Sequence, residues 1–409
     1  MIAKRIKEDL TALEQFTATP GKGCTRLPFT PEARAAVEFL KQRMAGAGLS
    51  VREDAAGNVF GVLPGEDPEL PCIMMGSHYD SVVNGGNFDG IAGVVGAIET
   101  ARQLQERGIR RKRNYVAAGF CDEEGTRFGT GFFGSGAMLG HRDEAYCGRF
   151  RDKNGVSIAD AMREYGLDPA KIETAKWPQG SIGAFIESHV EQGPVLDAEQ
   201  TELGIVECIV GMRRYMVTIS GRADHAGTTP MDMRKDPVEA AAKVIAQIPA
   251  WAREQGGGTV ATVGYMNVRP GGVNIIASEV EFSVDIRSRS NENIVAIAEK
   301  MEQALQSAVK HYDGSFQIET KLSITPVQMS EKLTGILEQS CKSRSFSFRR
   351  MLSGAGHDAL EIGQEIPSAM IFVASKDGRS HCPIESSKYE DLAKASVVVT
   401  DLAETLLTE

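Results

Sequence analysis

The sequence has no excess of basic residues. It carries 45 Lys and Arg against 55 Asp and Glu, which gives a formal net charge of −10. A general nucleic-acid-binding protein normally presents a basic face, so this balance argues against that class. The sequence also lacks any apolar run of about 18 residues, the length that a membrane-spanning helix needs. We therefore expect neither a nucleic-acid partner nor a membrane partner.

Paired cysteine motifs are absent as well. The seven cysteines are scattered, odd in number and form no Cys-x-x-Cys pair. The charged segment 1–16 lacks the apolar core and the cleavage pattern of a secretory signal peptide. Both features favour a reduced, cytoplasmic protein with free thiols.

The rest of the composition is that of a globular protein, with 42% hydrophobic and 24% charged residues. A length of 409 residues favours two domains. Amphipathic helical segments alternate with short apolar strands along most of the chain. The predicted helices include 30–48 and 90–108, and the predicted strands are 72–77, 115–120, 184–188 and 369–374. This alternation predicts an α/β domain with a mainly parallel central sheet and flanking helices.

The middle of the chain, residues 211–326, follows a different pattern. Its segments read strand, helix, strand, strand, helix, strand, over residues 215–220, 236–255, 259–268, 279–286, 291–311 and 316–323. The strand at 279–286 alternates apolar and polar residues. This order is typical of a split βαβ, ferredoxin-like α+β domain. We expect it to be inserted into the larger domain, which then consists of residues 1–210 and 327–409.

Polar residues gather in four loops, each of which comes after a predicted strand. In open α/β sheets, ligand sites form at the carboxyl ends of the strands, so loops distant in sequence can meet there. The residues are His78, Asp80 and Asp89 in the first loop, Glu123 and Glu124 in the second, His189 in the third and His381 in the fourth.

Imidazole and carboxylate groups are ligands for Zn²⁺ and neighbouring first-row metals. Two such ions need a bridging group, usually a carboxylate, and further ligands for each ion. Five of these residues supply that set, and Glu123, beside a proposed ligand, is placed to accept a proton from an activated water. The proposed ligands are His78, Asp89, Glu124, His189 and His381. Any one of them alone is more often part of a polar turn or a structural histidine.

A glycine motif at 129–134, GTGFFG, matches the Gly-x-Gly-x-x-Gly pattern of dinucleotide-binding folds. That pattern needs to follow a strand directly and to have an acidic residue at the end of the next strand. Here the polar segment 121–128 intervenes and no strand follows at the required place. A turn after the acidic pair is the better interpretation.

Six motifs occur in an order that resembles the amidase/hydantoinase/carbamoylase branch of the dinuclear zinc exopeptidases. They are GSHYDSVVNGGNFDG, DEEGTRF, HVEQGPVL, DHAGTTPM, GGVN and SGAGHD. This branch includes N-carbamoyl-L-amino-acid hydrolases and allantoate amidohydrolases. The resemblance covers nearly the whole chain. It implies a catalytic domain, an inserted lid and dimerisation domain, and two divalent metal ions per subunit, with Zn²⁺ preferred and Mn²⁺, Co²⁺ or Ni²⁺ as alternatives.

The same resemblance assigns roles to the metal ligands. His78 and His189 would each bind one or other metal ion, with Asp89 as the bridge. Glu124 and His381 would complete the second metal site.

Further roles follow from the resemblance. Glu123 would be the general base and then the general acid, and Asp80 would orient His78. His225 would stabilise the oxyanion, although it could equally cap a turn. Arg287 would clamp a substrate carboxylate, although it could equally be a surface arginine. The substrate-binding candidates are Gln192, Arg213, Asn274, Arg287, Gly356 and His357.

The expected function is hydrolysis of a carbamoyl or ureido C–N bond in a small carboxylate substrate, by a homodimer that associates through the inserted domain. Segment 211–221 resembles allantoate amidohydrolases, whereas 269–274 resembles the carbamoylases. One alternative is an N-acyl-L-amino-acid amidohydrolase or dipeptidase. Another is a non-catalytic, metal-binding dimeric scaffold, against which the complete set of ligands argues.

Overall fold

The computed structural model describes residues 1–409, which divide into two compact units. One consists of Met1–Glu207 and Met329–Glu409, and the other of Cys208–Gln328. The segment predicted as an insertion, 211–326, falls inside the second unit. Each unit has its own buried apolar core.

The main sheet has nine strands in the order β1-β2-β4-β3-β5-β14-β6-β12, with β13 paired to β6. The strands are β1 (Ser50–Glu53), β2 (Val59–Leu63), β3 (Cys72–His78), β4 (Tyr115–Phe120), β5 (Ile182–Val190), β6 (Leu203–Ile209), β12 (Val327–Gln328), β13 (Phe348–Ser353) and β14 (Ser368–Val373). The four central strands, β4, β3, β5 and β14, are parallel. The pairs β1–β2, β2–β4, β14–β6 and β6–β12 are antiparallel. The predicted α/β class with a mainly parallel central sheet is confirmed.

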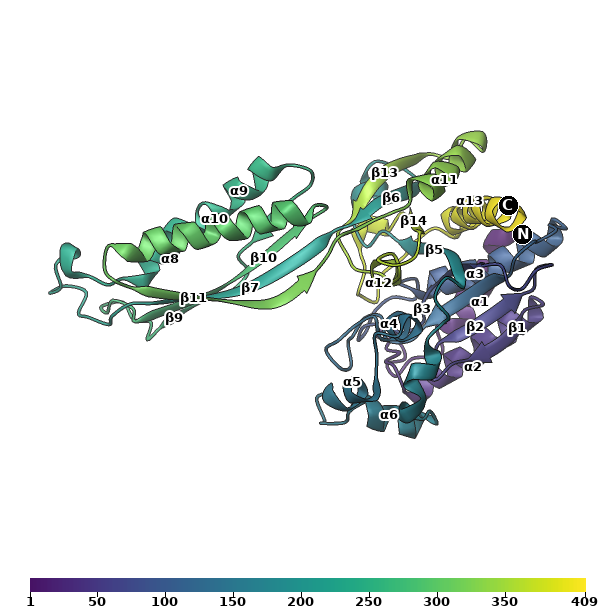
Figure 1. The fold of residues 1–409 in the computed structure, drawn as a ribbon, viewed down its shortest axis with the longest axis horizontal. Coiled ribbons are helices and arrows are strands. Elements are labelled where there is room, and N and C mark those ends of the chain that lie inside the picture. The colour runs from purple at the N-terminus through teal and green to yellow at the C-terminus, as the bar shows by residue number, and fades with distance from the viewer. The chain divides into compact units, whose positions relative to one another are not determined.

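The central strands are buried almost completely because helices cover them. Strands β3, β4 and β14 have every residue buried, which explains why they are continuous apolar runs in the sequence. The helices of this unit are α1 (Ile2–Leu13), α2 (Pro31–Gly46), α3 (Ile91–Glu106), α4 (Phe133–Leu139), α5 (Glu144–Arg149), α6 (Ile158–Tyr165), α7 (Val195–Ala198), α11 (Glu331–Ser343), α12 (Asp358–Ile362) and α13 (Tyr389–Thr408). Helix α3 packs on β3, β4 and β5, and the terminal helices α1 and α13 pack on α3 and on each other (Figure 1).

The helix ends follow from local sequence. Helix α2 begins after Thr30, whose side chain accepts a hydrogen bond from the Ala33 N–H, and Pro31 occupies its first turn. Helix α3 begins directly after Gly90, which has φ +64°. A Cβ at Gly90 would lie 2.3 Å from the His78 ring, so this position has room only for glycine. The loop that carries Asp89 therefore passes into α3 in close contact with His78.

The second unit has a sheet in the order β11-β7-β10-β8, with β9 also paired to β10, and all its pairings are antiparallel. Its elements are β7 (Gly211–Ser220), α8 (Pro237–Ile245), α9 (Ile248–Gln255), β8 (Val260–Thr262), β9 (Met266–Arg269), β10 (Glu279–Ser288), α10 (Asn291–Lys310) and β11 (Ser315–Ile324). On β10 every second residue is buried, including Phe282 and Ile286, and these pack against the core formed with the helices. The order of elements is the predicted split βαβ arrangement.

Two details of this unit differ from the sequence prediction. The single helix expected over 236–255 is two helices, α8 and α9, because Pro249 has no N–H to continue the helical hydrogen bonds. The single strand expected over 259–268 is two short strands, β8 and β9, separated at 263–265.

In the whole chain, no helix is both long enough and apolar enough to cross a bilayer.

Candidate metal centre

The predicted polar residues lie at the carboxyl ends of the four central parallel strands. His78 is the last residue of β3, and Glu123 and Glu124 follow β4 directly. His189 was expected in the loop after 184–188, but it lies inside β5, which continues to Val190 and pairs with β14 to its end. His381 follows β14 and a short 3₁₀ turn.

Asp89 lies at the centre of these residues. Its Oδ1 is 3.2 Å from Nε2 of His189 and 3.5 Å from Nε2 of His78. Its Oδ2 is 3.2 Å from Nε2 of His381, which in turn lies 3.4 Å from Oε1 of Glu124. Asp89 thus belongs to two groups of possible metal ligands, His78–Asp89–His189 and Asp89–Glu124–His381. Both buried histidines face the same carboxylate oxygen, and His381 faces the other.

The hydrogen bonds of the two buried histidines set the tautomer of their neutral rings. Nδ1 of His189 lies 2.9 Å from the Val190 carbonyl oxygen, and Nδ1 of His78 lies 3.2 Å from the Asp80 carbonyl oxygen. Since a carbonyl only accepts, each Nδ1 carries the proton in the neutral ring, and each Nε2 lone pair faces Asp89. The Gly90 N–H also donates to Nε2 of His189 at 3.2 Å, as expected for an acceptor nitrogen.

The donor set fits a divalent cation. Oδ1 of Asp89 and Oε1 of Glu124 are buried and accept no hydrogen bond. When the His78 and His189 rings are neutral, Oδ1 of Asp89 faces two nitrogen lone pairs, which is costly, and a bound cation removes that cost. Two imidazoles with one carboxylate oxygen, and one imidazole with two carboxylates, are both usual ligand sets for zinc-type metals. The residues therefore suit two ions that share Asp89.

Without an ion, the same contacts move the pKa values of these groups. Burial opposes ionisation of Asp89, but its contacts with His189, His381 and His78, which become hydrogen bonds when those rings are protonated, outweigh burial and hold the pKa of Asp89 well below its ordinary value. Burial alone would lower the pKa of His189, but the hydrogen bond that its protonated ring donates to Asp89 reverses that effect and raises it. Hydrogen bonds with Asp89 and then Glu124 raise the pKa of His381 to about 10.

Asp80 holds the acidic turn in place. Its two carboxylate oxygens accept hydrogen bonds from the backbone N–H groups of Glu123 at 3.1 Å and of Glu124 at 3.3 Å. Its backbone carbonyl, rather than its carboxylate, makes the shorter contact with the His78 ring, since the carboxylate lies 3.6 Å from Nδ1. Asp80 therefore contacts both the histidine and the turn.

The glycine motif at 129–134 supports the acidic turn from the other side. The backbone N–H groups of Phe132 and Phe133 donate to the carbonyls of Glu123 and Asp122 at 3.0 Å. A Cβ at Gly131 would lie 2.3 Å from the Glu123 carbonyl oxygen, which explains the glycine there. The motif is a structural contact of the acidic turn.

Glu123 has the environment of a proton carrier. It is buried, and its Oε2 lies 3.8 Å from Nε2 of His78. Burial raises the pKa of Glu123 well above its ordinary value, against the opposing effect of His78, and Glu124 and Asp358 raise it further. A buried carboxyl group with a raised pKa is suited to accept a proton and to donate it again.

Three further candidates lie in the same unit. Gln192 donates from Nε2 to Oδ2 of Asp89 at 2.8 Å, and that Nε2 is 3.2 Å from Nε2 of His381. His357 is buried, and its ring lies 4.4 Å from the ring of His189. Nε2 of His357 is 2.9 Å from the Ser353 hydroxyl. The His357 ring therefore packs against the His189 ring and is only 1% exposed to solvent. Its neighbour Gly356 is half-buried, so Gly356 is the more accessible of these two predicted substrate contacts.

His225 and Asn274 lie together in the second unit. The segments 224–226 and 274–276 pair in antiparallel fashion, and the Ala226 N–H donates to the Asn274 carbonyl at 3.0 Å. Nδ1 of His225 accepts hydrogen bonds from the N–H groups of Gly227 at 3.0 Å and Thr228 at 3.2 Å. His225 does cap a turn, and because Nδ1 accepts, its exposed Nε2–H is free to act as a donor.

The two candidate arginines of this unit point to opposite faces of its sheet. Arg213 pairs with Ile286, which faces the helices, and its guanidinium donates to Oδ1 of Asn291 at 3.2 Å. Arg287 pairs with Met212 on the other face, and its Nε donates to Oδ1 of Asp285 at 2.9 Å. The structure does not bring these two side chains together.

Sequence reasoning missed several buried acidic groups around the cluster. Glu187 accepts hydrogen bonds from the Ser77 hydroxyl at 2.7 Å and from the Ala359 N–H at 2.8 Å, which ties β3 and the start of α12 to β5. Asp358 is fully buried, and both its oxygens lack a hydrogen-bond donor. Glu187 precedes His189 by two residues and so shares its face of the strand, a signal that was present in the sequence.

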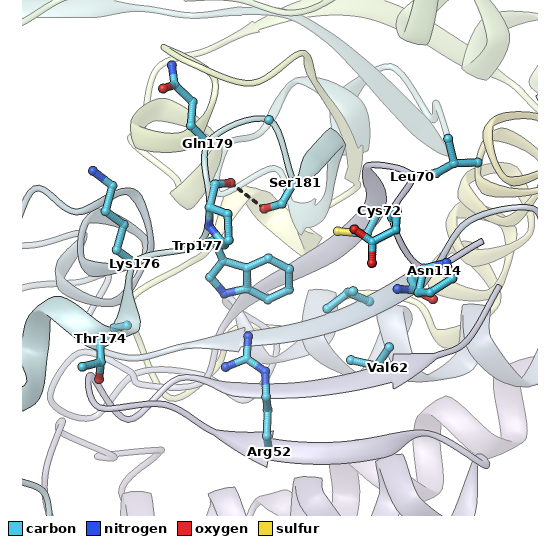
Figure 2. A pocket seen from close by; sticks show the side chains of 16 residues that line it. Arg52, Val62, Leu70, Cys72, Asn114, Thr174, Lys176, Trp177, Gln179 and Ser181 are labelled. Atoms are coloured by element: carbon cyan, nitrogen blue, oxygen red, sulfur yellow. Dashed lines mark hydrogen bonds between the residues drawn. The ribbon is translucent and has the colours of Figure 1, made fainter. Parts of the chain in front are cut away.

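A hollow of about 540 Å³ lies elsewhere in the first unit (Figure 2). Figure 2 shows the Arg52 guanidinium directed at the Trp177 ring, and its carbon lies 4.8 Å from the centre of that ring. Cys72, the first residue of β3, lines the hollow, whereas His78 is the last residue of that strand. No group of potential metal ligands lies in the hollow. The groups of potential metal ligands lie instead toward the opposite end of β3.

The chain matches a known protein family. A model of peptidase family M20/M25/M40 matches residues 63–405. The chain belongs to this family. The predicted class of enzyme is confirmed, since the members of this family are metal-dependent hydrolases, and the predicted resemblance to hydantoinase/carbamoylase amidases is confirmed by the relatives below.

Three relatives match the chain over nearly its whole length. It is 40% identical over 397 residues to an N-carbamoyl-L-amino-acid amidohydrolase of Paenarthrobacter aurescens, and the alignment covers 97% of this chain and 96% of the relative. It is 36% identical over 401 residues to an allantoate amidohydrolase of Bacillus subtilis, covering 98% and 97% of the two chains. A hydantoinase/carbamoylase family amidase of Burkholderia multivorans superposes with a TM-score of 0.89 at 28% identity, covering 100% and 98%.

Metal binding is expected to strengthen as the pH rises. His381 has a pKa of about 10 in the metal-free protein, against an ordinary value of 6.5, so it holds a proton at neutral pH that an ion must displace. The apparent Co²⁺ affinity should therefore rise by up to about tenfold per pH unit for each displaced proton. Calorimetric titration between about pH 6.5 and 8 measures this slope.

The variant His381→Asn provides the control, because it removes that proton. The slope of log apparent Co²⁺ affinity against pH should be lower in this variant than in the wild type by about one displaced proton. Equal slopes in the two proteins would show that His381 does not bind the ion. In the metal-free wild type, the stabilising contact of protonated His381 with Asp89 is complete below pH 6.5 and is lost as the pH rises through about 10.

Proposed function

We propose that this protein hydrolyses the carbamoyl or ureido C–N bond of a small carboxylate substrate, as an N-carbamoyl-L-amino-acid hydrolase or an allantoate amidohydrolase. One observation carries the proposal: Asp89 presents one oxygen to His78 and His189 and the other to His381. This geometry suits a bridged pair of ions beside a buried proton carrier. The names of the two curated relatives point to the carbamoyl and ureido substrates.

In this proposal the chain provides the proton chemistry. The bound ions would polarise the scissile carbonyl and lower the pKa of a bound water. Glu123 accepts the proton of the attacking water and returns it to the leaving nitrogen, a transfer for which its raised pKa is suited. Asp80 holds the backbone of Glu123 and Glu124 throughout, so the base and the ligand keep their spacing.

Residues of the second unit are proposed to bind the substrate. His225 offers an exposed Nε2–H because its Nδ1 is used by the turn, and such a donor suits the oxyanion of the tetrahedral intermediate. Asn274 neighbours it on the paired segment. Arg287 carries the charge that would hold the substrate carboxylate, with Arg213 as a second candidate. In the first unit, Gln192 and the Gly356 backbone complete the proposed substrate contacts.

The metal and the assembly complete the proposal. Zn²⁺ is the preferred ion because two of the three ligands at the His78–His189 position are imidazoles, although Mn²⁺, Co²⁺ and Ni²⁺ accept the same ligands. A homodimer that forms through the inserted unit is proposed from the resemblance to the family. A cytoplasmic location is proposed from the seven free cysteines, six of which are buried.

A substrate panel tests the function. The purified protein, loaded in turn with Zn²⁺, Mn²⁺, Co²⁺ or Ni²⁺, is assayed on N-carbamoyl-L-amino acids, allantoate and N-acyl-L-amino acids. Release of ammonia and CO₂ from a carbamoyl or ureido substrate is expected. Turnover of the N-acyl compounds alone would instead identify an acylase or dipeptidase. Tight binding of metal without any turnover would favour the non-catalytic scaffold.

Glu123→Gln tests the proposed proton carrier. The amide keeps the size of the side chain but cannot accept the proton, so kcat should fall at least about 100-fold, the usual contribution of general acid–base catalysis. The metal content should remain that of the wild type, because the two ligand groups that share Asp89 are complete without Glu123, which occurs only in a third group with His78 and Glu124.

The companion variant Glu124→Gln distinguishes the role of Glu124 as a proposed metal ligand from that of Glu123 as the proposed proton carrier. It removes a proposed ligand and should lose metal as well as activity. Metal content by mass spectrometry and turnover on the best panel substrate are measured together. A Glu123→Gln enzyme with full metal content and near-normal kcat would contradict the assigned role.

A further inference from the structure

Glu385 makes contacts at the metal centre that its position in the sequence does not reveal. Its side chain is buried, and Oε1 accepts hydrogen bonds from the backbone N–H groups of Phe88 and Asp89, both at 3.0 Å. These donors lie almost 300 residues earlier in the chain. A Cβ at Gly86 would lie 2.3 Å from the Glu385 side chain, so the loop before Asp89 fits closely over this carboxylate.

Ser380 connects the same carboxylate to the side chain of Asp89. Its hydroxyl lies 2.5 Å from Oε2 of Glu385 and 3.0 Å from Oδ2 of Asp89. Oδ2 is the oxygen that faces His381, the residue that follows Ser380. Because a hydroxyl has one hydrogen, it donates to one of these two oxygens at a time. Glu385 thus holds Asp89 through its backbone N–H, and the two carboxylates share the Ser380 hydroxyl.

We infer that Glu385 is a positioning residue for the site formed by Asp89, Glu124 and His381. The inference rests on the proposed pair of ions. Glu385 belongs to none of the groups of potential metal ligands, so we assign it a role in holding the ligands. It joins the loop of Asp89 to the loop of His381, and so fixes the spacing between ligands that come from opposite ends of the chain. Carboxylates that orient metal ligands commonly change metal affinity by 10- to 100-fold when removed.

The inference predicts different Co²⁺ affinities for the truncated variant Glu385→Ala and the conservative variant Glu385→Gln. Glu385→Ala removes both connections, and the affinity for one of the two Co²⁺ ions should fall by about 10- to 100-fold. In Glu385→Gln, the amide oxygen still accepts from Phe88 and Asp89, and the amide nitrogen donates to Ser380, which keeps its hydrogen for Asp89. The affinity of this variant should stay within about threefold of the wild type, as expected when hydrogen bonds rather than charge do the positioning.

The experiment is a calorimetric titration of the metal-free full-length protein with Co²⁺, combined with its thermal unfolding. Glu202→Ala is the matched control, because Glu202 also accepts a backbone N–H from a distant segment, that of Ser347, and contacts no residue of the cluster. It should lower the unfolding temperature without changing either Co²⁺ affinity. The double variant Glu385→Ala/Ser380→Ala should lose less affinity than the two single variants added together, because both act through Asp89.

The outcomes distinguish this inference from the proposed function. A wild type that fails to bind two Co²⁺ ions contradicts the proposed pair of ions itself. A wild type that binds two, with Glu385→Ala binding both equally tightly, overturns the role of Glu385 alone. Equal losses in Glu385→Ala and Glu385→Gln would also overturn it, since they would assign the effect to charge rather than to hydrogen bonds.

Discussion

The contact on which this molecule depends is that of one buried carboxylate with three imidazoles. Asp89 faces His189 and His78 with one oxygen and His381 with the other, at 3.2 to 3.5 Å. Oδ1 accepts no hydrogen bond, and the two buried histidines turn their lone pairs to it. With both rings neutral, such an arrangement is unfavourable in a dry interior, and either protonation of the rings or bound metal ions would relieve that cost.

The parallel sheet makes this contact possible because it brings four strand ends to one edge. The order β4-β3-β5-β14 places loops from the first and the last third of the chain beside each other. Buried carboxylates then fix these loops against one another. Asp80 binds the acidic turn, Glu187 ties β5 to β3 and α12, and Glu385 joins the loops of Asp89 and His381. These carboxylates accept hydrogen bonds from backbone N–H groups, and the bonds limit the movement of the loops that carry the ligands.

Much of this arrangement could be predicted from local patterns. The central strands are unbroken apolar runs because both their faces are buried, and each is followed by a polar loop, so strands and ligands are visible in the sequence. The outer strands β1 and β13 are half exposed and carry no such signal. The burial of His357 and the role of Glu385 depend on contacts with residues far away in sequence, which no local pattern encodes.

The central claim is that Asp89 bridges two metal ions, and a crystal structure of the metal-loaded protein tests it most directly. Anomalous difference maps at the absorption edge of the added metal should show two peaks about 3.5–4 Å apart, one on each side of Asp89. The first should contact His78 and His189, and the second Glu124 and His381. A single peak, or two peaks of which only one touches Asp89, would contradict the account.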